Sequence, residues 1–356
     1  AMSDPAGSGK RRWLAGGLLL LVLALLVAVA LLYSRYQRFQ EQHLSVPVEG
    51  LLYEFRSGAS LSRLAHDLAD RGVIEQPRLL ILLGRQMDVA HRLQAGEYRL
   101  RNDMTPADML STLAEGDIEQ YSLTVIEGQT FRALLAAVRA SEVIIGTLET
   151  DDTAEIMSRL GYPGEHPEGR FLPDTYHFPR GTTDVEFLQR AHDAMQQQLT
   201  LAWESRDEGL PLDNPYEALI LASIVEKETG RADERPRIAG VFTRRLRKGM
   251  RLQTDPTVIY GMGEAYDGNI RRRDLRTDTP YNTYTRDGLP PTPIALPGVA
   301  ALEAVMHPDE NGYLYFVATG DGKGSHYFSR TLKEHNMAVK KYQLGQSGIT
   351  LPDTGQ

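Results

Sequence analysis

The sequence predicts a mixed α+β protein behind a single N-terminal transmembrane helix. The chain of 356 residues has room for roughly two domains. An uncharged apolar run stands near its start, and beyond that run helical and strand patterns alternate without regular βαβ spacing. We therefore expect a membrane anchor followed by α+β domains.

The apolar run extends from Trp13 to Tyr33 and contains no charged residue. As a helix it would span about 32 Å, which matches a hydrocarbon core of about 30 Å. The basic residues 10–12 precede it, so we expect residues 1–12 to form a cytoplasmic tail. A cleaved signal peptide is the alternative, because Ala28-Val29-Ala30 resembles a cleavage site, although the apolar run continues past it.

A polar linker is expected at residues 34–45, followed by strands and helices in alternation. Ser60 and Thr105 are typical N-cap residues, and glycines stand where helices should end. The predicted elements of this first part are a strand at Leu51–Phe55, a helix from Leu61 that stops before Gly72, a helix at Pro77–Ala90, a strand at Gly96–Leu100 and a helix at Pro106–Glu115.

The longer second part is predicted to contain a long amphipathic helix, a buried apolar helix and a basic helix in succession. Its elements are a strand at Tyr121–Ile126, short helices and loops at 141–190, a helix at Val185–Glu204, a buried helix around Ala218–Val225, a basic helix at Arg235–Lys248, loops at 250–298, strands at Tyr313–Ala318 and His326–Ser329, a helix at Leu332–Tyr342 and a polar tail at 346–356.

Composition and motifs exclude several classes of function. The net charge of −8 argues against a protein that binds nucleic acid. The chain has no cysteine, which excludes disulfides, cysteine-ligated metals and thiol nucleophiles. It also has no zinc-protease, P-loop or nucleophile-elbow motif, and Gly320–Gly324 reads as a hairpin turn. We expect no cofactor and no metal, and we interpret the basic runs 244–248 and 271–273 as solvated faces.

Two carboxylates at the end of the buried helix are the best catalytic candidates. Glu226 continues the stripe of Leu219, Ala222 and Ser223, whereas Glu228 lies about 200° away around the helix. A buried carboxyl group has a raised pKa, which suits a general acid near neutral pH. The alternative is that Glu226 is buried and salt-bridged to a following arginine.

Two loop segments, Arg251–Thr257 and Pro280–Tyr284, combine amides, hydroxyls and aromatic rings. Sugar-binding grooves need such groups, because pyranose rings present flat apolar faces and many hydroxyl groups. The alternative is that Asn, Asp and Thr only hold these loops by local hydrogen bonds.

The second part of the chain contains several long motifs: LILASIVEKE (Leu219–Glu228), RLQTDPTVIYGMG (Arg251–Gly263), YNTY (Tyr281–Tyr284), GLPPTPIALPG (Gly288–Gly298) and YLYFVATGDGKGSHYFS (Tyr313–Ser329). These motifs resemble those of the YceG-like family of membrane-anchored endolytic murein transglycosylases. The resemblance implies a LysM-like βααβ module at residues 46–118 and a catalytic domain at 119–345. It also implies a single-pass protein of the bacterial inner membrane, with the catalytic domain in the periplasm.

The implied activity is cleavage of the β-1,4 bond between N-acetylmuramic acid and N-acetylglucosamine within peptidoglycan strands. The product carries a 1,6-anhydromuramoyl end, and the cut would limit the length of new strands. Expected partners are glycan strands, the bilayer through Trp13–Tyr33 and a peptidoglycan synthase.

The resemblance maps the catalytic glutamate onto Glu226, acting first as acid and then as base. Glycan-binding residues are expected at Gln253, Asp255, Tyr281, Asn282 and Tyr284. Two alternatives remain open: a hydrolytic muramidase in which a second acid such as Asp255 activates water, and a membrane-tethered scaffold that binds glycan without cleaving it.

Overall fold

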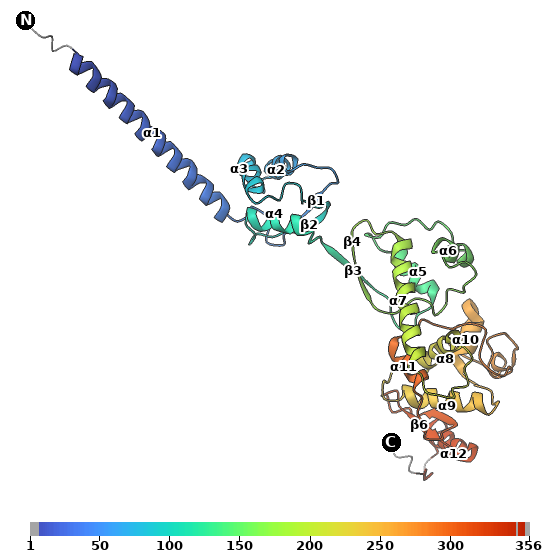
Figure 1. Ribbon diagram of the computed structural model, residues 1–356. Coiled ribbons are helices and arrows are strands. Elements are labelled where there is room, and N and C mark those ends of the chain that lie inside the picture. Colours follow the sequence, from blue (N-terminus) through green and yellow to red (C-terminus); the bar gives the residue numbers. More distant parts are fainter. Residues whose placement is uncertain (1–6, 347, 353–356) are drawn as a thin grey trace, which may run out of the picture. The chain divides into compact units, whose positions relative to one another are not determined.

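A computed structural model describes residues 7–346 and 348–352 and shows two compact units (Figure 1). The first unit ends at Tyr121 and the second begins at Ser122. Both contain helices and strands, so the mixed fold class is confirmed.

Helix α1 (Gly7–Glu41) contains the predicted membrane segment. Its residues Gly16–Glu41 are long and apolar enough to cross a membrane. The helix extends well into the region expected to be a polar linker. Phe39 explains this difference, because it is buried in the core of the first unit together with Leu44 and so gives the end of the helix a packed face.

The first unit has the predicted order of strand, two helices and strand. Strands β1 (Leu51–Phe55) and β2 (Gly96–Leu100) pair antiparallel, with Tyr53 opposite Tyr98. Helix α2 (Leu61–Asp70) begins at Ser60, whose hydroxyl accepts from the backbone N–H of Arg63. The remaining helices are α3 (Pro77–Gln86) and α4 (Pro106–Glu115).

A small two-stranded sheet and three helices come next along the chain. Strand β3 (Gln120–Thr124) pairs with β4 (Thr175–Pro179). Helices α5 (Phe131–Arg139), α6 (Thr153–Arg159) and α7 (Asp184–Glu204) accompany this sheet. The last of these matches the long helix predicted from the amphipathic pattern.

The core of this unit surrounds α8 (Pro215–Glu228), which packs against α7, α9 (Arg235–Arg247), α10 (Asp255–Met262) and α11 (Val299–Met306). Residues Ala218–Val225 are all buried, which confirms the predicted buried helix. Helix α10 and the short turns η1 (Gly263–Ala265) and η2 (Asp274–Arg276) lie in a region expected to be loop. Pro256 in the first turn of α10 suits a helix start, so the expectation of a loop over Asp255–Met262 was wrong.

The C-terminal part is a hairpin with one helix. Strands β5 (Tyr315–Ala318) and β6 (His326–Ser329) pair antiparallel, and Gly320–Gly324 lie in the predicted connection. Helix α12 (Leu332–Tyr342) packs on both strands. This part has a small core of its own, formed by Val317, Tyr327 and Ala338.

Candidate active site

The second unit contains a cavity of about 500 Å³ between its helical core and the C-terminal hairpin. We call it the Glu228 groove. One wall comes from the end of α8, α9, the segment before α10 and Tyr284, and the other from β5, β6 and α12. The lining residues are Glu228, Arg245, Leu252, Gln253, Thr254, Asp255, Tyr284, Tyr315, Phe316, Val317, Ala318, His326, Leu332, His335, Asn336, Val339 and Gln343.

Glu228 reaches this groove because α8 ends there. The helix begins at Asn214, whose side chain accepts from the backbone N–H of Glu217 at 3.0 Å, and Glu228 is its last residue. Thr254 donates its hydroxyl to Oε1 of Glu228. Burial raises the pKa of Glu228 to about 7, and the neighbouring Asp255 carboxylate acts in the same direction, while Thr254 and Arg245 oppose them. At neutral pH this carboxyl group can therefore both give and take a proton.

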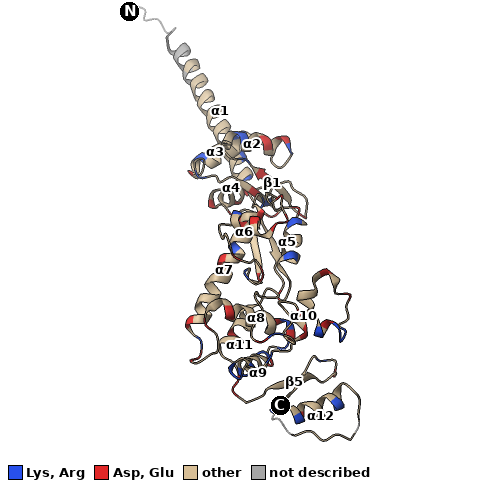
Figure 2. Ribbon diagram, turned by 90° about the vertical axis from the view of Figure 1, so that its right-hand side faces the viewer, with Lys and Arg blue, Asp and Glu red and all other residues tan. Residues whose placement is uncertain are grey.

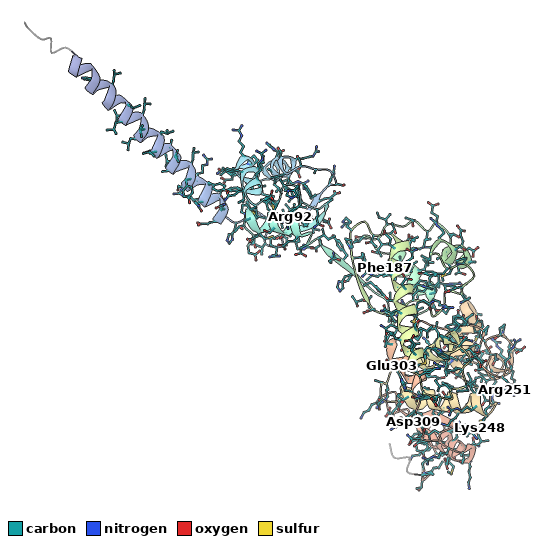
Figure 3. All side chains as sticks on the ribbon, in the orientation of Figure 1. Arg92, Phe187, Lys248, Arg251, Glu303 and Asp309 are labelled. Atoms are coloured by element: carbon teal, nitrogen blue, oxygen red, sulfur yellow. The ribbon has the colours of Figure 1, made fainter. Side chains whose placement is uncertain are left out.

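Buried threonines hold the segment that carries Thr254. The Thr254 amide donates to the Thr283 hydroxyl at 3.1 Å, and the Thr257 hydroxyl lies 2.9 Å from the same oxygen. These threonines join the loops around residues 251–257 and 280–284. Arg251, labelled in Figure 3, adds a bond from Nη1 to the Tyr284 carbonyl at 2.9 Å. The two motif segments singled out in the sequence are thus held side by side.

Three of the five predicted glycan-binding residues line the groove: Gln253, Asp255 and Tyr284. Gln253 has a positive φ of 52°, and its side chain is exposed between the buried residues Leu252 and Thr254. Tyr284 donates its hydroxyl to Oδ1 of Asp255 at 2.6 Å. Burial and this bond raise the pKa of Tyr284, so the phenol stays a hydrogen-bond donor.

The other two predicted binding residues, Tyr281 and Asn282, lie outside the groove lining. The Tyr281 hydroxyl is 2.8 Å from that of Thr292, and its ring packs edge-on against Tyr260. Asn282 is 1 % exposed, and its amide donates to the carbonyl of Thr277 at 2.7 Å. These contacts hold the loop, and a role of either residue in glycan binding stays a prediction.

Glu226 enters a different environment. Its Oε1 lies 3.2 Å from Nη2 of Arg235, and its Oε2 accepts from the amide of Gly298 at 3.0 Å. The same Arg235 nitrogen lies 3.5 Å from Oε2 of Glu127. Glu226 therefore makes a salt bridge to a following arginine, which was the alternative expected from its sequence position. Its assignment as the catalytic acid stays a prediction.

The basic run 244–248 was interpreted as a solvated face, and for Arg245 this interpretation is wrong. Figure 2 shows the cluster of basic residues on α9. Arg245 of this helix is 8 % exposed and lines the groove. The signal that could have identified it is helical spacing, because Arg245 lies seven residues after Ile238 and four after Val241, on the buried face of α9.

The opposite wall of the groove carries His326. Buried Glu234 accepts from both the amide and Nδ1 of this residue, at 2.9 and 2.7 Å. The carboxylate thereby fixes the ring orientation of His326 at the start of β6.

A further carboxyl group with a shifted pKa lies away from the groove. Glu168 is 4 % exposed and accepts from the Phe131 amide at 2.9 Å and from the Tyr260 hydroxyl at 3.1 Å. Burial raises its pKa to about 7. Because Glu168 joins α5 to α10, its contacts indicate a structural role.

Within residues 7–346 and 348–352, no group of three or more His, Asp or Glu side chains is arranged to hold a metal ion. We therefore assign no metal ligands. The side chains of the groove themselves supply an acid, several hydroxyl and amide groups and aromatic rings.

Comparison with known proteins identifies the family of the chain. The model of the YceG-like family matches residues 53–341. The chain belongs to the YceG-like family. Its sequence is 33 % identical over 304 residues to an endolytic murein transglycosylase of Bacillus subtilis, covering 80 % of this chain and 83 % of the relative.

Other YceG-like relatives are more distant. An endolytic murein transglycosylase of Streptococcus pneumoniae R6 is 25 % identical, and the match covers 90 % of this chain but 65 % of that protein. A 2.6 Å crystal structure of a YceG-like protein from Listeria monocytogenes is 29 % identical, covers 82 % of this chain and 99 % of the other, and has a TM-score of 0.47.

Proposed function

We propose that this YceG-like protein is an endolytic peptidoglycan lytic transglycosylase and that Glu228 transfers the protons. One observation carries the residue assignment: Glu228 presents a carboxyl group with a pKa of about 7 to a groove large enough for sugar rings. The curated relatives named endolytic murein transglycosylases support the activity. Glu226 then has a structural role, in its ion pair with Arg235.

In the first step, protonated Glu228 gives its proton to O4 of the leaving N-acetylglucosamine. The bond between this oxygen and C1 of the muramoyl residue breaks. The muramoyl acetamido oxygen stabilises the positive charge at C1, which explains how one carboxylate can suffice where ordinary glycosidases use two.

In the second step, the Glu228 carboxylate takes the proton of the muramoyl C6 hydroxyl. The C6 oxygen bonds to C1 and closes the 1,6-anhydro ring, so no water is consumed. Glu228 ends protonated and ready for another cycle. A carboxyl group whose pKa lies near the working pH is suited to both steps.

The other groove residues hold the glycan. Asp255 and Tyr284 form one hydrogen-bonded unit, and Gln253 places an exposed amide beside them. These groups match the hydroxyl and acetamido groups of the sugars. Because Tyr284 donates to Asp255, the phenol and the carboxylate are oriented before substrate arrives.

The first unit and α1 place the enzyme at its substrate. The βααβ order of the first unit supports a LysM-like module that orients glycan strands. Helix α1 anchors the protein in the inner membrane, with its N-terminus in the cytoplasm and both units in the periplasm. There the enzyme cuts strands as a peptidoglycan synthase extends them and so limits their length.

The test is mass spectrometry of the fragments that the full-length protein releases from purified murein. The expected wild-type products carry anhydromuramoyl ends and are one water lighter than hydrolysed ends. Glu228→Gln should bind murein and release no fragments, because an amide gives no proton to the leaving oxygen.

Glu226→Gln is the matched control, since it makes the same chemical change two residues away. It should still release anhydro products. Loss of cleavage in Glu226→Gln together with an active Glu228→Gln would restore Glu226 as the acid. Hydrolysed ends from the wild type would indicate a muramidase that uses Asp255, and binding without fragments would indicate a scaffold.

A further inference from the structure

Arg245 is a buried cation held by neutral groups. Its Nε donates to the Leu314 carbonyl at 2.7 Å, and its Nη1 donates to the carbonyls of Leu252 at 2.7 Å and Arg251 at 3.3 Å. Its Cζ lies 5.1 Å from the ring centre of Tyr315. These partners satisfy hydrogen bonds, but none of them carries a full negative charge.

Buried charges in proteins are normally paired with an opposite charge. Across the residues that the structure describes, no carboxylate lies within ion-pair distance of the Arg245 guanidinium. Arg245 does line the same groove as Glu228. Both residues belong to the same wall, so the opposite charge is available there whenever Glu228 is ionised.

The surroundings of Glu228 leave Arg245 as its main positive neighbour. Thr254 and Asp255 face Glu228 from the start of α10, Tyr284 from the following loop and Arg245 from α9. His326 and His335 line the opposite wall. Burial lowers the pKa of His335, and the charge of Arg245 lowers it further. Asp255 repels the Glu228 carboxylate, whereas Arg245 attracts it.

We propose that Arg245 is a positioning residue whose buried charge balances the Glu228 carboxylate between the two proton transfers. This inference rests on the proposed role of Glu228. When Glu228 has given its proton to the leaving oxygen, the groove gains a negative charge beside Arg245. The attraction makes Glu228 a stronger acid in the first step and limits its strength as a base in the second.

The test is the pH dependence of murein cleavage by the full-length protein in detergent, for wild type and Arg245→Met. Activity requires protonated Glu228 and therefore falls as the pH rises through its pKa. An opposite charge nearby typically lowers a carboxyl pKa by about one unit or more. The alkaline limb of the Arg245→Met profile should therefore move up by about one pH unit, and the plateau should fall about tenfold.

Two further variants separate charge from packing. Arg245→Lys keeps the positive charge, so the alkaline limb of its pH profile should lie within a few tenths of a pH unit of the wild-type limb. Arg244→Met is the matched control, because Nε of Arg244 donates to the next carbonyl along, that of Tyr313, at 2.7 Å. Its Nη1 bonds the carbonyl of Asp309, labelled in Figure 3, and Arg244 lines a different cavity. The Arg244→Met protein should be less stable than wild type, but the alkaline limb of its pH profile should stay at the wild-type pH.

An Arg245→Met profile that is reduced in height but unmoved along the pH axis would overturn the proposal, since loss of structure alone lowers activity at every pH. An equal shift in Arg244→Met would overturn it as well. Full activity of Glu228→Gln would instead defeat the proposed function itself, so the two failures are distinguishable.

Discussion

Glu226 and Glu228 lie in the same last turn of α8, but their side chains contact two different regions of the second unit. Because residues two positions apart in an α-helix are rotated by about 200°, the two side chains point to opposite sides. Glu226 enters a cluster with Arg235, Glu127 and the Gly298 amide. Glu228 lines a groove, and among the described residues Thr254 alone donates a side-chain hydrogen bond to it.

Burial alone does not make a carboxyl group suitable for proton transfer. Glu226 has a side chain only 5 % exposed, yet both of its oxygens are used in contacts that join α8 to α9 and to the start of α11. Glu228 has no ion-pair partner among the described residues and borders open space. A residue that must release and recover a proton needs access to substrate as well as a shifted pKa.

The largest expected effect separates these two residues directly. Glu228→Gln should lower kcat/KM for murein by about 10²- to 10⁴-fold, the usual cost of losing a general acid–base group. Glu226→Gln should stay within about tenfold of wild type, because Gln keeps an oxygen for the Gly298 amide. Rates of release of anhydromuramoyl ends measure both. Equal losses would show that the comparison is wrong.

The second prediction concerns the stability of the Glu226 region. Arg235→Met leaves the Glu226 carboxylate buried without its cation and should lower the free energy of unfolding by about 3 kcal/mol. Urea unfolding followed by circular dichroism measures the change. The double variant Glu226→Leu with Arg235→Met should recover part of the loss, because it leaves less buried charge unpaired. If Arg235→Met were as stable as wild type but inactive, the cluster would have a role in catalysis.

The third prediction uses Glu168, a buried carboxyl group with a pKa of about 7 that lies outside the groove. The folded protein holds this proton more tightly than the unfolded chain, so stability falls as the pH rises from about 4.5 to 7. The loss amounts to roughly 3 kcal/mol. Glu168→Gln should remove this loss and keep cleavage activity.

Thermal unfolding between pH 5 and 8 tests this prediction, with Glu142→Gln as an exposed control. The control should keep the pH dependence of wild type. If Glu168→Gln abolished cleavage while remaining folded, Glu168 would have to be counted among the catalytic groups.

The smallest effect is expected at Thr254, whose hydroxyl stabilises the ionised form of Glu228. Thr254→Val removes this donor, so the pKa of Glu228 should rise and the alkaline limb of the pH–rate profile should move to higher pH. We expect a loss of about tenfold at the plateau, in line with one hydrogen bond to a charged group. Thr254→Ser keeps the hydroxyl and should behave like wild type. An unchanged limb in Thr254→Val would show that this bond does not affect the proton of Glu228.

Much of the fold followed from local patterns. The strands at Leu51–Phe55 and Gly96–Leu100 lie where alternation and turn residues predicted them. The apolar run before Glu226 forms the expected buried helix, because a helix that is apolar on all sides can only be stable when enclosed. Helix α10 was missed because its short apolar pattern lies among Gly, Pro and Thr residues that are typical of loops.

The candidate site was predicted less completely. Gln253, Asp255 and Tyr284 were selected by residue type, and the structure brings them together. Tyr281 and Asn282 were selected on the same grounds, yet their contacts are internal to the loop. Residue type cannot separate these cases, because the same amide or phenol can bind a sugar or hold a backbone.

By itself, the sequence determined the apolar N-terminal helix, the mixed fold class, the family and the helix that carries both glutamates. These features depend on local periodicity and on motifs, which a single chain displays directly. Only the tertiary structure decided which glutamate pairs with a cation and which one lines the groove. It also decided that Arg245 is buried beside the groove. These outcomes depend on Thr254 and Gly298, which lie 26 and 72 residues from their glutamate partners and contact the end of α8 only in the folded protein.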